Sequence, residues 1–171
     1  MIEVGARLPM GTFRVKPDDG PIVQVATSDL FSGQTVVLVG VPGAFTSTCH
    51  NAHVPQFVEN AGPLRARGAD RIVVIAVNDA YVMRVWRQSL GAVDKIDFMA
   101  DGDAEYAAAL GLAVPMAGMG IRLKRFSALV RDGVVRALHF EPEAGRGISS
   151  TGAAMMLAEL RAMASGIAPP P

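Results

Sequence analysis

The chain has 171 residues, of which 50% are hydrophobic, and its 16 basic side chains balance its 16 acidic ones. This length suits one domain over residues 1–171, and the apolar content can fill a large core, which excludes wholesale disorder. A formal net charge of zero provides no field to hold a polyanion, so we expect no nucleic acid and no membrane surface as a partner.

The two ends of the chain carry no targeting or anchoring pattern. Residues 1–5 lack the basic and long apolar regions of a signal peptide, and no run of about 18 apolar residues could span a bilayer. Residues 166–171 end in three prolines and are expected to form a flexible tail. We therefore expect a soluble, cytoplasmic protein.

Two strand-helix units are predicted in the first half of the chain. Residues 35–41 and 71–77 are short, apolar and β-branched, which is typical of strands buried on both faces. Helix-like stretches follow at 48–61 and 80–90, and Pro55 predicts a kink in the first of them. A strand followed by a helix, twice, implies parallel βαβ units.

Shorter elements and a hairpin are predicted in the second half. Asp132 and Gly133 lie between two apolar runs, which is a strong signal for an antiparallel hairpin. In chain order we expect a strand over 98–100, a helix over 103–112, hairpin strands over 125–130 and 134–140, and a helix over 152–164. The predicted class is α/β, with a mixed sheet covered by helices on both faces.

The single cysteine, Cys49, is the main candidate for reactivity. One cysteine forms no internal disulfide, and no Cys/His cluster has zinc-site spacing. A lone cysteine is more often a small buried hydrophobe. Cys49, however, lies at a strand-to-helix corner, where unpaired N–H groups and the helix dipole favour a thiolate over a thiol.

The stretch VPGAFTSTCH, residues 41–50, resembles the active-site signature of the peroxiredoxins. Pro42, Thr46 and Cys49 occupy its Pro-x-x-x-Thr-x-x-Cys positions, and the Pro-Gly-Ala-Phe-Thr form is similar to the type II, peroxiredoxin-5-like subfamily. The resemblance covers nearly the whole chain, with further matches at 77–79, 82–83, 86, 100–101, 123–127 and 132–133.

This resemblance implies a thioredoxin-like fold in which Cys49 is the peroxidatic cysteine and Arg125 the active-site arginine. A thiolate that attacks a hydroperoxide needs donors to align the two oxygens and charge to stabilise the leaving RO⁻. Arg125 would supply the charge and Thr46 a hydroxyl. Pro42 would wall the pocket without adding a competing donor.

Two departures from the family pattern bear on the mechanism. Ser47 stands where many members have a proline, so the turn before the sulfur loses a stiffening residue. Family members that form an internal disulfide carry their second cysteine either near position 74 or within the segment that matches residues 147–151. This chain has Val74 at the first place and no cysteine in the second. A sulfenic acid on Cys49 must therefore be resolved by an external thiol. The resemblance favours glutathione with glutaredoxin, with thioredoxin as the other reductant, and no metal or prosthetic group.

Two histidines close to Cys49 raise the alternatives of a Cys-His hydrolase and a metal site. His50 is one residue along the helix and points away from the sulfur, whereas His53, at i+4, could touch it. A hydrolase also needs an orienting residue and an oxyanion hole, and two ligands make no zinc site. Both histidines are therefore interpreted as part of a polar helix face, and Trp86 as core.

A rival function shares the first chemical step. A peroxide sensor or redox relay would also oxidise Cys49, and would then pass the oxidation to a partner protein through a mixed disulfide. The Met- and Gly-rich residues 116–120 are expected to form a flexible apolar loop that contacts a second subunit of a homodimer.

Overall fold

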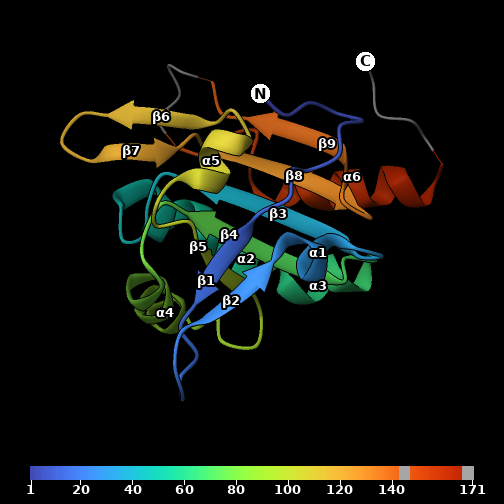
Figure 1. Ribbon diagram of the computed structural model, residues 1–171. Helices are drawn as coiled ribbons and strands as arrows, with labels where there is room; N and C mark the ends of the chain where they lie inside the picture. The colour runs from blue at the N-terminus through green and yellow to red at the C-terminus, as the bar shows by residue number, and fades with distance from the viewer. Residues whose placement is uncertain (143–146, 167–171) are drawn as a thin grey trace.

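A seven-stranded mixed sheet forms the centre of the molecule (Figure 1). The computed structural model describes residues 1–142 and 147–166, so the expected tail lies outside the described residues from residue 167 onward. Across the sheet the strands follow the order β2-β1-β5-β4-β3-β8-β9. Their bounds are β1 Thr12–Val15, β2 Val23–Ala26, β3 Thr35–Val41, β4 Arg71–Ala76, β5 Asp97–Ala100, β8 Phe126–Arg131 and β9 Val134–Phe140.

The middle of the sheet has the predicted pairing. β3 and β4 are parallel, as are β4 and β5. On its other side β3 pairs antiparallel with β8, and β8 and β9 form the predicted hairpin. At the hairpin turn Asp132 and Gly133 have φ values of 49° and 72°, the left-handed conformation that an Asp-Gly pair adopts readily. The predicted hairpin is therefore confirmed.

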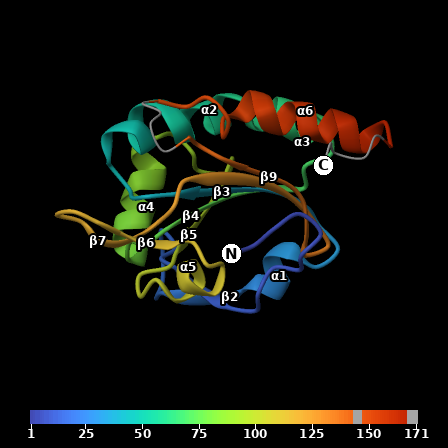
Figure 2. The same ribbon diagram turned by 90° about the horizontal axis from the view of Figure 1, so that it is seen from above.

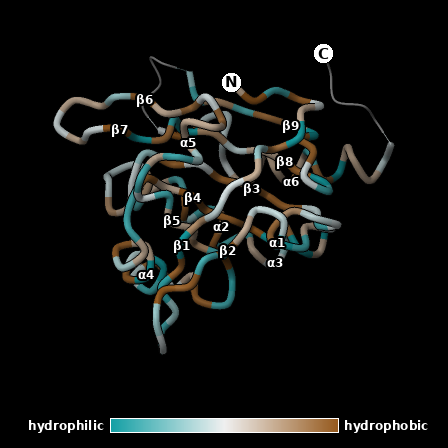
Figure 3. Tube along the Cα trace, in the orientation of Figure 1, coloured by the Kyte–Doolittle hydropathy of each residue, from teal (hydrophilic) through white to brown (hydrophobic). Residues whose placement is uncertain are grey.

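Helices cover both faces of the sheet (Figure 2). One core cluster packs α2, α3, α4 and α6 on the first face, and the other packs α1 and α5 on the second. Every residue of β3 is buried, because its side chains alternate between the two clusters. Figure 3 shows the hydropathy of the chain in the orientation of Figure 1. The helix bounds are α1 Thr27–Phe31, α2 Val54–Glu59, α3 Ala61–Ala66, α4 Ala80–Ser89, α5 Glu105–Ala109 and α6 Ala153–Ala164.

The helix expected over residues 48–61 is divided into three pieces. It begins as a π-helical turn, Cys49–His53, labelled η1, continues as α2 and then as α3. Pro55 has no N–H to donate, and just before it the N–H of Val54 reaches back five residues to the carbonyl of Cys49. The break thus begins at Cys49, one turn earlier than the kink expected at Pro55.

Several elements were not predicted. β1, β2 and α1 are each only four or five residues long. Phe13 is the one fully buried residue of the two strands, which therefore show no apolar run in the sequence. The expected flexible loop over 116–120 is instead the tip of a second sheet made of β6, Ala113–Met116, and β7, Gly120–Leu123. The helix expected over 103–112 shortens to α5, because Asp101 caps the N–H groups of Tyr106 and Ala107.

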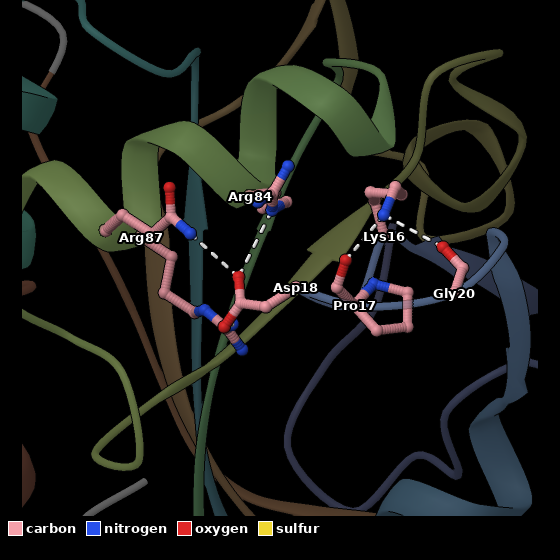
Figure 4. A network of polar contacts seen from close by, with 7 residues as sticks. Lys16, Pro17, Asp18, Gly20, Arg84 and Arg87 are labelled. Carbon is pink, nitrogen blue, oxygen red and sulfur yellow. Dashed lines mark hydrogen bonds and ion pairs between the residues drawn. The ribbon is translucent and has the colours of Figure 1, made fainter.

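A charged cluster ties the connection between β1 and β2 to α4 (Figure 4). One oxygen of Asp18 accepts from Arg84 Nε at 3.1 Å and from Gln88 Nε2 at 2.7 Å. Arg87 Nη2 lies 3.5 Å from the other oxygen. Lys16 Nζ donates to backbone carbonyls of the same connection. Within residues 1–142 and 147–166, the structure contains no helix that could span a lipid bilayer.

Candidate functional site

The loop that follows β3 is held by one hydrogen bond within the loop and by another to Asn78, which follows β4. Thr46 donates its hydroxyl to the carbonyl oxygen of Gly43 at 2.8 Å, and the N–H of Ala44 donates to Asn78 Oδ1 at 2.9 Å. Gly43 is buried, and a Cβ there would lie 3.1 Å from Arg122 Nη1 and 3.3 Å from Thr46 Cγ2, so a larger residue would require these side chains to shift by a few tenths of an ångström. The loop therefore delivers the chain to the start of η1 in one conformation.

Cys49 lies at the first position of η1 and is fully buried. Its Sγ accepts a hydrogen bond from Arg125 Nη2 at 3.3 Å. Arg125 directly precedes β8, and the pairing of Gly40 with Phe126 sets it beside the end of β3, where the loop to Cys49 departs. Sheet register thus brings together two residues that are 76 positions apart in sequence.

The other two predicted site residues lie in the loop before η1. Pro42 and Thr46 are both half-buried. The Thr46 hydroxyl donates its proton to the carbonyl of Gly43 rather than to the sulfur. The sulfur instead accepts a hydrogen bond from Arg125. The Thr46 oxygen can therefore still accept hydrogen bonds through its lone pairs, but it has no second proton to donate.

The prediction of a polar helix face for His53 was wrong. Its imidazole is fully buried, with Nδ1 at 2.8 Å from Arg125 Nη1 and Nε2 at 2.9 Å from the carbonyl oxygen of Thr151. Burial, aided by the nearby charge of Arg125, lowers the pKa of His53 to about 4 despite the opposing hydrogen bond to Thr151. His53 is therefore neutral at physiological pH, and its spacing of four from Cys49 was the only hint in the sequence.

His50 is also held by a specific partner. Its Nδ1 accepts from Trp86 Nε1 at 2.9 Å, and its ring stacks on Phe45 with centroids 5.5 Å apart. Trp86 itself is fully buried, as expected for a core residue. The contact ties η1 to α4 and engages the His50 ring with Trp86 rather than with the sulfur, as its position one residue after Cys49 predicts.

The charge at Arg125 is not neutralised by an acid in the described part of the chain. Within residues 1–142 and 147–166, no carboxylate lies within 4.0 Å of its guanidinium. Its two identified partners are the neutral ring of His53 and the sulfur of Cys49. Within the described residues the charge of Arg125 therefore faces the sulfur, where it can stabilise negative charge that develops on a neighbouring oxygen.

A buried nucleophile beside a fixed cation can displace a leaving group that departs as an anion. The His and Asp/Glu side chains of the described residues form no group of three or more, with or without Cys49, that could hold a metal ion. The arrangement thus supports chemistry carried out by the sulfur, with Arg125 as the electrostatic partner.

Comparisons with known proteins agree with this chemistry. The Redoxin family matches residues 3–155. Peroxiredoxin-2E, chloroplastic, of Arabidopsis thaliana is 41% identical over 162 residues, which cover 92% of this chain and 69% of that protein. Reduced Prx3 of Vibrio vulnificus in complex with H₂O₂ has a TM-score of 0.87 and 38% identity, over 94% of this chain and 99% of the other. Peroxiredoxin 5 of Alvinella pompejana has a TM-score of 0.80 and 26% identity, over 94% and 99%.

Proposed function

Because the chain belongs to the peroxiredoxins of the redoxin family and is a thiol-dependent peroxidase with a thioredoxin-like fold, we propose that Cys49 is the residue that attacks the peroxide. Its likeness to peroxiredoxin-2 and peroxiredoxin 5 chains is consistent with the type II subfamily. The observation that carries the assignment is the contact between Cys49 Sγ and Arg125 Nη2 at 3.3 Å. Cys49 is also the only sulfhydryl in the sequence.

The first step transfers one oxygen from the peroxide to the sulfur. The Cys49 thiolate attacks the near oxygen of ROOH, an S–O bond forms as the O–O bond breaks, and RO⁻ leaves while the proton remains on the sulfenic acid. Arg125 stabilises the charge as it moves from sulfur to the departing oxygen. Thr46, whose proton is engaged by Gly43, offers a lone pair to the O–H of the peroxide. Pro42 closes one side of the pocket.

An external thiol completes the cycle in this proposal. The sulfenic acid condenses with one thiol to give a mixed disulfide and water, and a second thiol then releases Cys49 and forms a disulfide. Each turnover therefore consumes one peroxide and two thiols. Glutathione with glutaredoxin is the proposed reductant, and thioredoxin the alternative. Because Cys49 is 0% exposed, η1 must move outward before a thiol as large as glutathione reaches the sulfur.

A homodimer and a cytoplasmic location complete the proposal. Two large apolar side chains near the site, Phe45 in the loop before η1 and Ile121 on β7, are each 49% exposed, which suits a contact with a second subunit. The cytoplasm is a reducing compartment that supplies the thiol the cycle needs. Sedimentation equilibrium tests the first point, since a mass close to 17.9 kDa would contradict it.

Peroxide consumption in the presence of each reductant tests the proposed cycle. We expect repeated turnover with glutathione and glutaredoxin, no turnover by Cys49→Ser, and a glutathione adduct on Cys49 in the mass spectrum. Turnover with thioredoxin but not with glutathione and glutaredoxin would identify thioredoxin as the reductant instead. Consumption of one equivalent of peroxide followed by arrest with both reductants would favour a peroxide sensor or redox relay.

A further inference from the structure

The partners of His53 determine which of its ring nitrogens carries the proton. The carbonyl oxygen of Thr151 can only accept, so Nε2, 2.9 Å away, must bear the hydrogen. The guanidinium of Arg125 can only donate, so Nδ1, 2.8 Å from Nη1, must offer a lone pair. His53 is thereby held as the neutral Nε2–H tautomer, and its buried ring connects Arg125 to the backbone at Thr151.

Glu141 holds the backbone at Thr151 in turn. Its Oε1 accepts from the N–H of Thr151 at 2.8 Å, from the Thr151 hydroxyl at 2.7 Å and from the N–H of Ser150 at 2.9 Å, while Oε2 accepts from the Ser149 hydroxyl at 2.7 Å. Burial opposes the charge, but these bonds lower the pKa of Glu141 to about 2. An ionised carboxylate thus organises residues 149–151, which we call the strap.

The strap lies close against α2. A Cβ at Gly152, which follows the strap, would be 2.5 Å from Gln56 Oε1, the end of a side chain on α2, so the two segments lie in contact at this point. Thr151 is fully buried as a result. With the strap held from one side by Glu141 and from the other by α2, the carbonyl of Thr151 has a fixed position toward His53.

Arg125 needs this support because of its shape and surroundings. The guanidinium is planar, so holding Nη1 on His53 also sets the direction of Nη2, the nitrogen that contacts Cys49 Sγ. No carboxylate of the described residues lies within 4.0 Å to hold it otherwise, and the residue is only partly buried. Without His53 the long arginine side chain would be free to turn toward solvent.

We propose that Glu141 and His53 are positioning residues for the peroxidase reaction, acting in sequence through the strap to hold Arg125 against Cys49. The inference rests on the proposed roles of Cys49 and Arg125. Neither positioning residue contacts the sulfur or the peroxide. Their effect on the reaction exists only when Arg125 is present to be positioned, and this dependence separates positioning from a general contribution to folding.

A double-mutant cycle tests that dependence. Single-turnover oxidation by H₂O₂ is followed through the fluorescence of Trp86, the only tryptophan, in His53→Leu, Glu141→Gln, Arg125→Ala and the two double variants. We expect each positioning variant to lower the second-order rate constant about tenfold when Arg125 is present and to have no effect in the Arg125→Ala background. His53→Gln, whose amide supplies both a donor and an acceptor, should restore most of the rate.

Glu159→Gln serves as the matched control, because Glu159 also binds a histidine, His139 at 2.8 Å, but within residues 1–142 and 147–166 it forms no hydrogen bond with Arg125, His53 or the strap. Its rate constant should equal that of the wild type. Equal losses with and without Arg125, or wild-type rates in both positioning variants beside a slow Arg125→Ala, would overturn this inference alone. A wild-type rate in Arg125→Ala would overturn the role proposed for Arg125 and this inference with it.

Discussion

Two polar clusters in this molecule have similar contact distances but differ in their exposure to solvent. The exposed cluster gathers Arg84, Arg87 and Gln88 around Asp18 at 2.7 to 3.5 Å. The buried cluster links Cys49, Arg125, His53, Thr151 and Glu141 with the principal contacts at 2.7 to 3.3 Å. Distance alone does not separate them.

Solvent and charge balance separate them. The Asp18 side chain is 47% exposed, so water and salt compete for every contact it makes, and two arginines share its one negative charge. In the buried cluster His53 and Thr151 are fully enclosed, and Arg125 has no nearby acid among the described residues. The comparison teaches that removing a partner costs little where water can replace it and much where it cannot.

Removal of the sulfur gives the largest expected effect on the buried cluster. Cys49→Ser replaces a thiol by a hydroxyl, which is far less acidic and a much weaker nucleophile, so peroxide reduction should disappear. Stopped-flow mixing with H₂O₂ measures the rate, and a thermal melt shows whether the fold persists. Peroxide consumption at the wild-type rate would contradict the role of Cys49.

Removal of the cation comes next. Arg125→Ala should lower the second-order rate constant by about 10² to 10³, the range found when one donor to a developing anion is lost. Arg125→Lys should recover only part of this, because one ammonium cannot hold both the sulfur and His53 in the planar fork of a guanidinium. Arg131→Ala is the control and should react normally, because Arg131 is an exposed arginine at the far end of β8, the strand that Arg125 precedes.

Acid should weaken the buried cluster before it affects the exposed one. The pKa of His53 is about 4 in the folded chain and 6.5 in its ordinary state, so the unfolded chain binds the proton more readily in between. Stability is therefore full above pH 6.5 and falls as the pH drops toward 4, by about 3.5 kcal/mol at most, since one pKa unit corresponds to about 1.4 kcal/mol.

Urea unfolding at a series of pH values measures this loss. Between pH 6.5 and 4.5 His53 accounts for it, and below 4.5 Glu141, whose pKa is lowered to about 2 by its hydrogen bonds against the effect of burial, adds a loss in the same direction. His53→Gln, which does not titrate, should flatten the upper part of the curve. An unchanged slope in that variant would contradict the assignment.

The exposed cluster should give the smallest effect. Asp18→Asn removes the charge that Arg84 and Arg87 share, yet the rate of peroxide reduction should stay at the wild-type value and the melting temperature should hardly move. The small change in melting temperature should vanish in high salt, because ions screen exposed pairs. A loss of activity in this variant would break the contrast between the two clusters.

The features that the sequence predicted correctly depend on interactions between residues that are close together along the chain. The buried strands β3 and β4, the hairpin at Asp132 and Gly133, and the position of Cys49 at the start of a helical turn are confirmed. Each depends on residues close in sequence. β1 and β2 were missed because short edge strands with one fully buried side chain carry no periodic apolar signal.

The amino-acid sequence by itself determined the order of the central strands and helices along the chain, the single cysteine and, through its motif, the family and the pairing of Cys49 with Arg125. Only the tertiary structure decided that His53 is buried and that Glu141 and Thr151 support it. The contacts that do so join residues 72 and 98 positions apart, and they depend on which strands pair and where the strap lies. Local sequence patterns record nearest neighbours along the chain, whereas burial and proton position follow from neighbours in space.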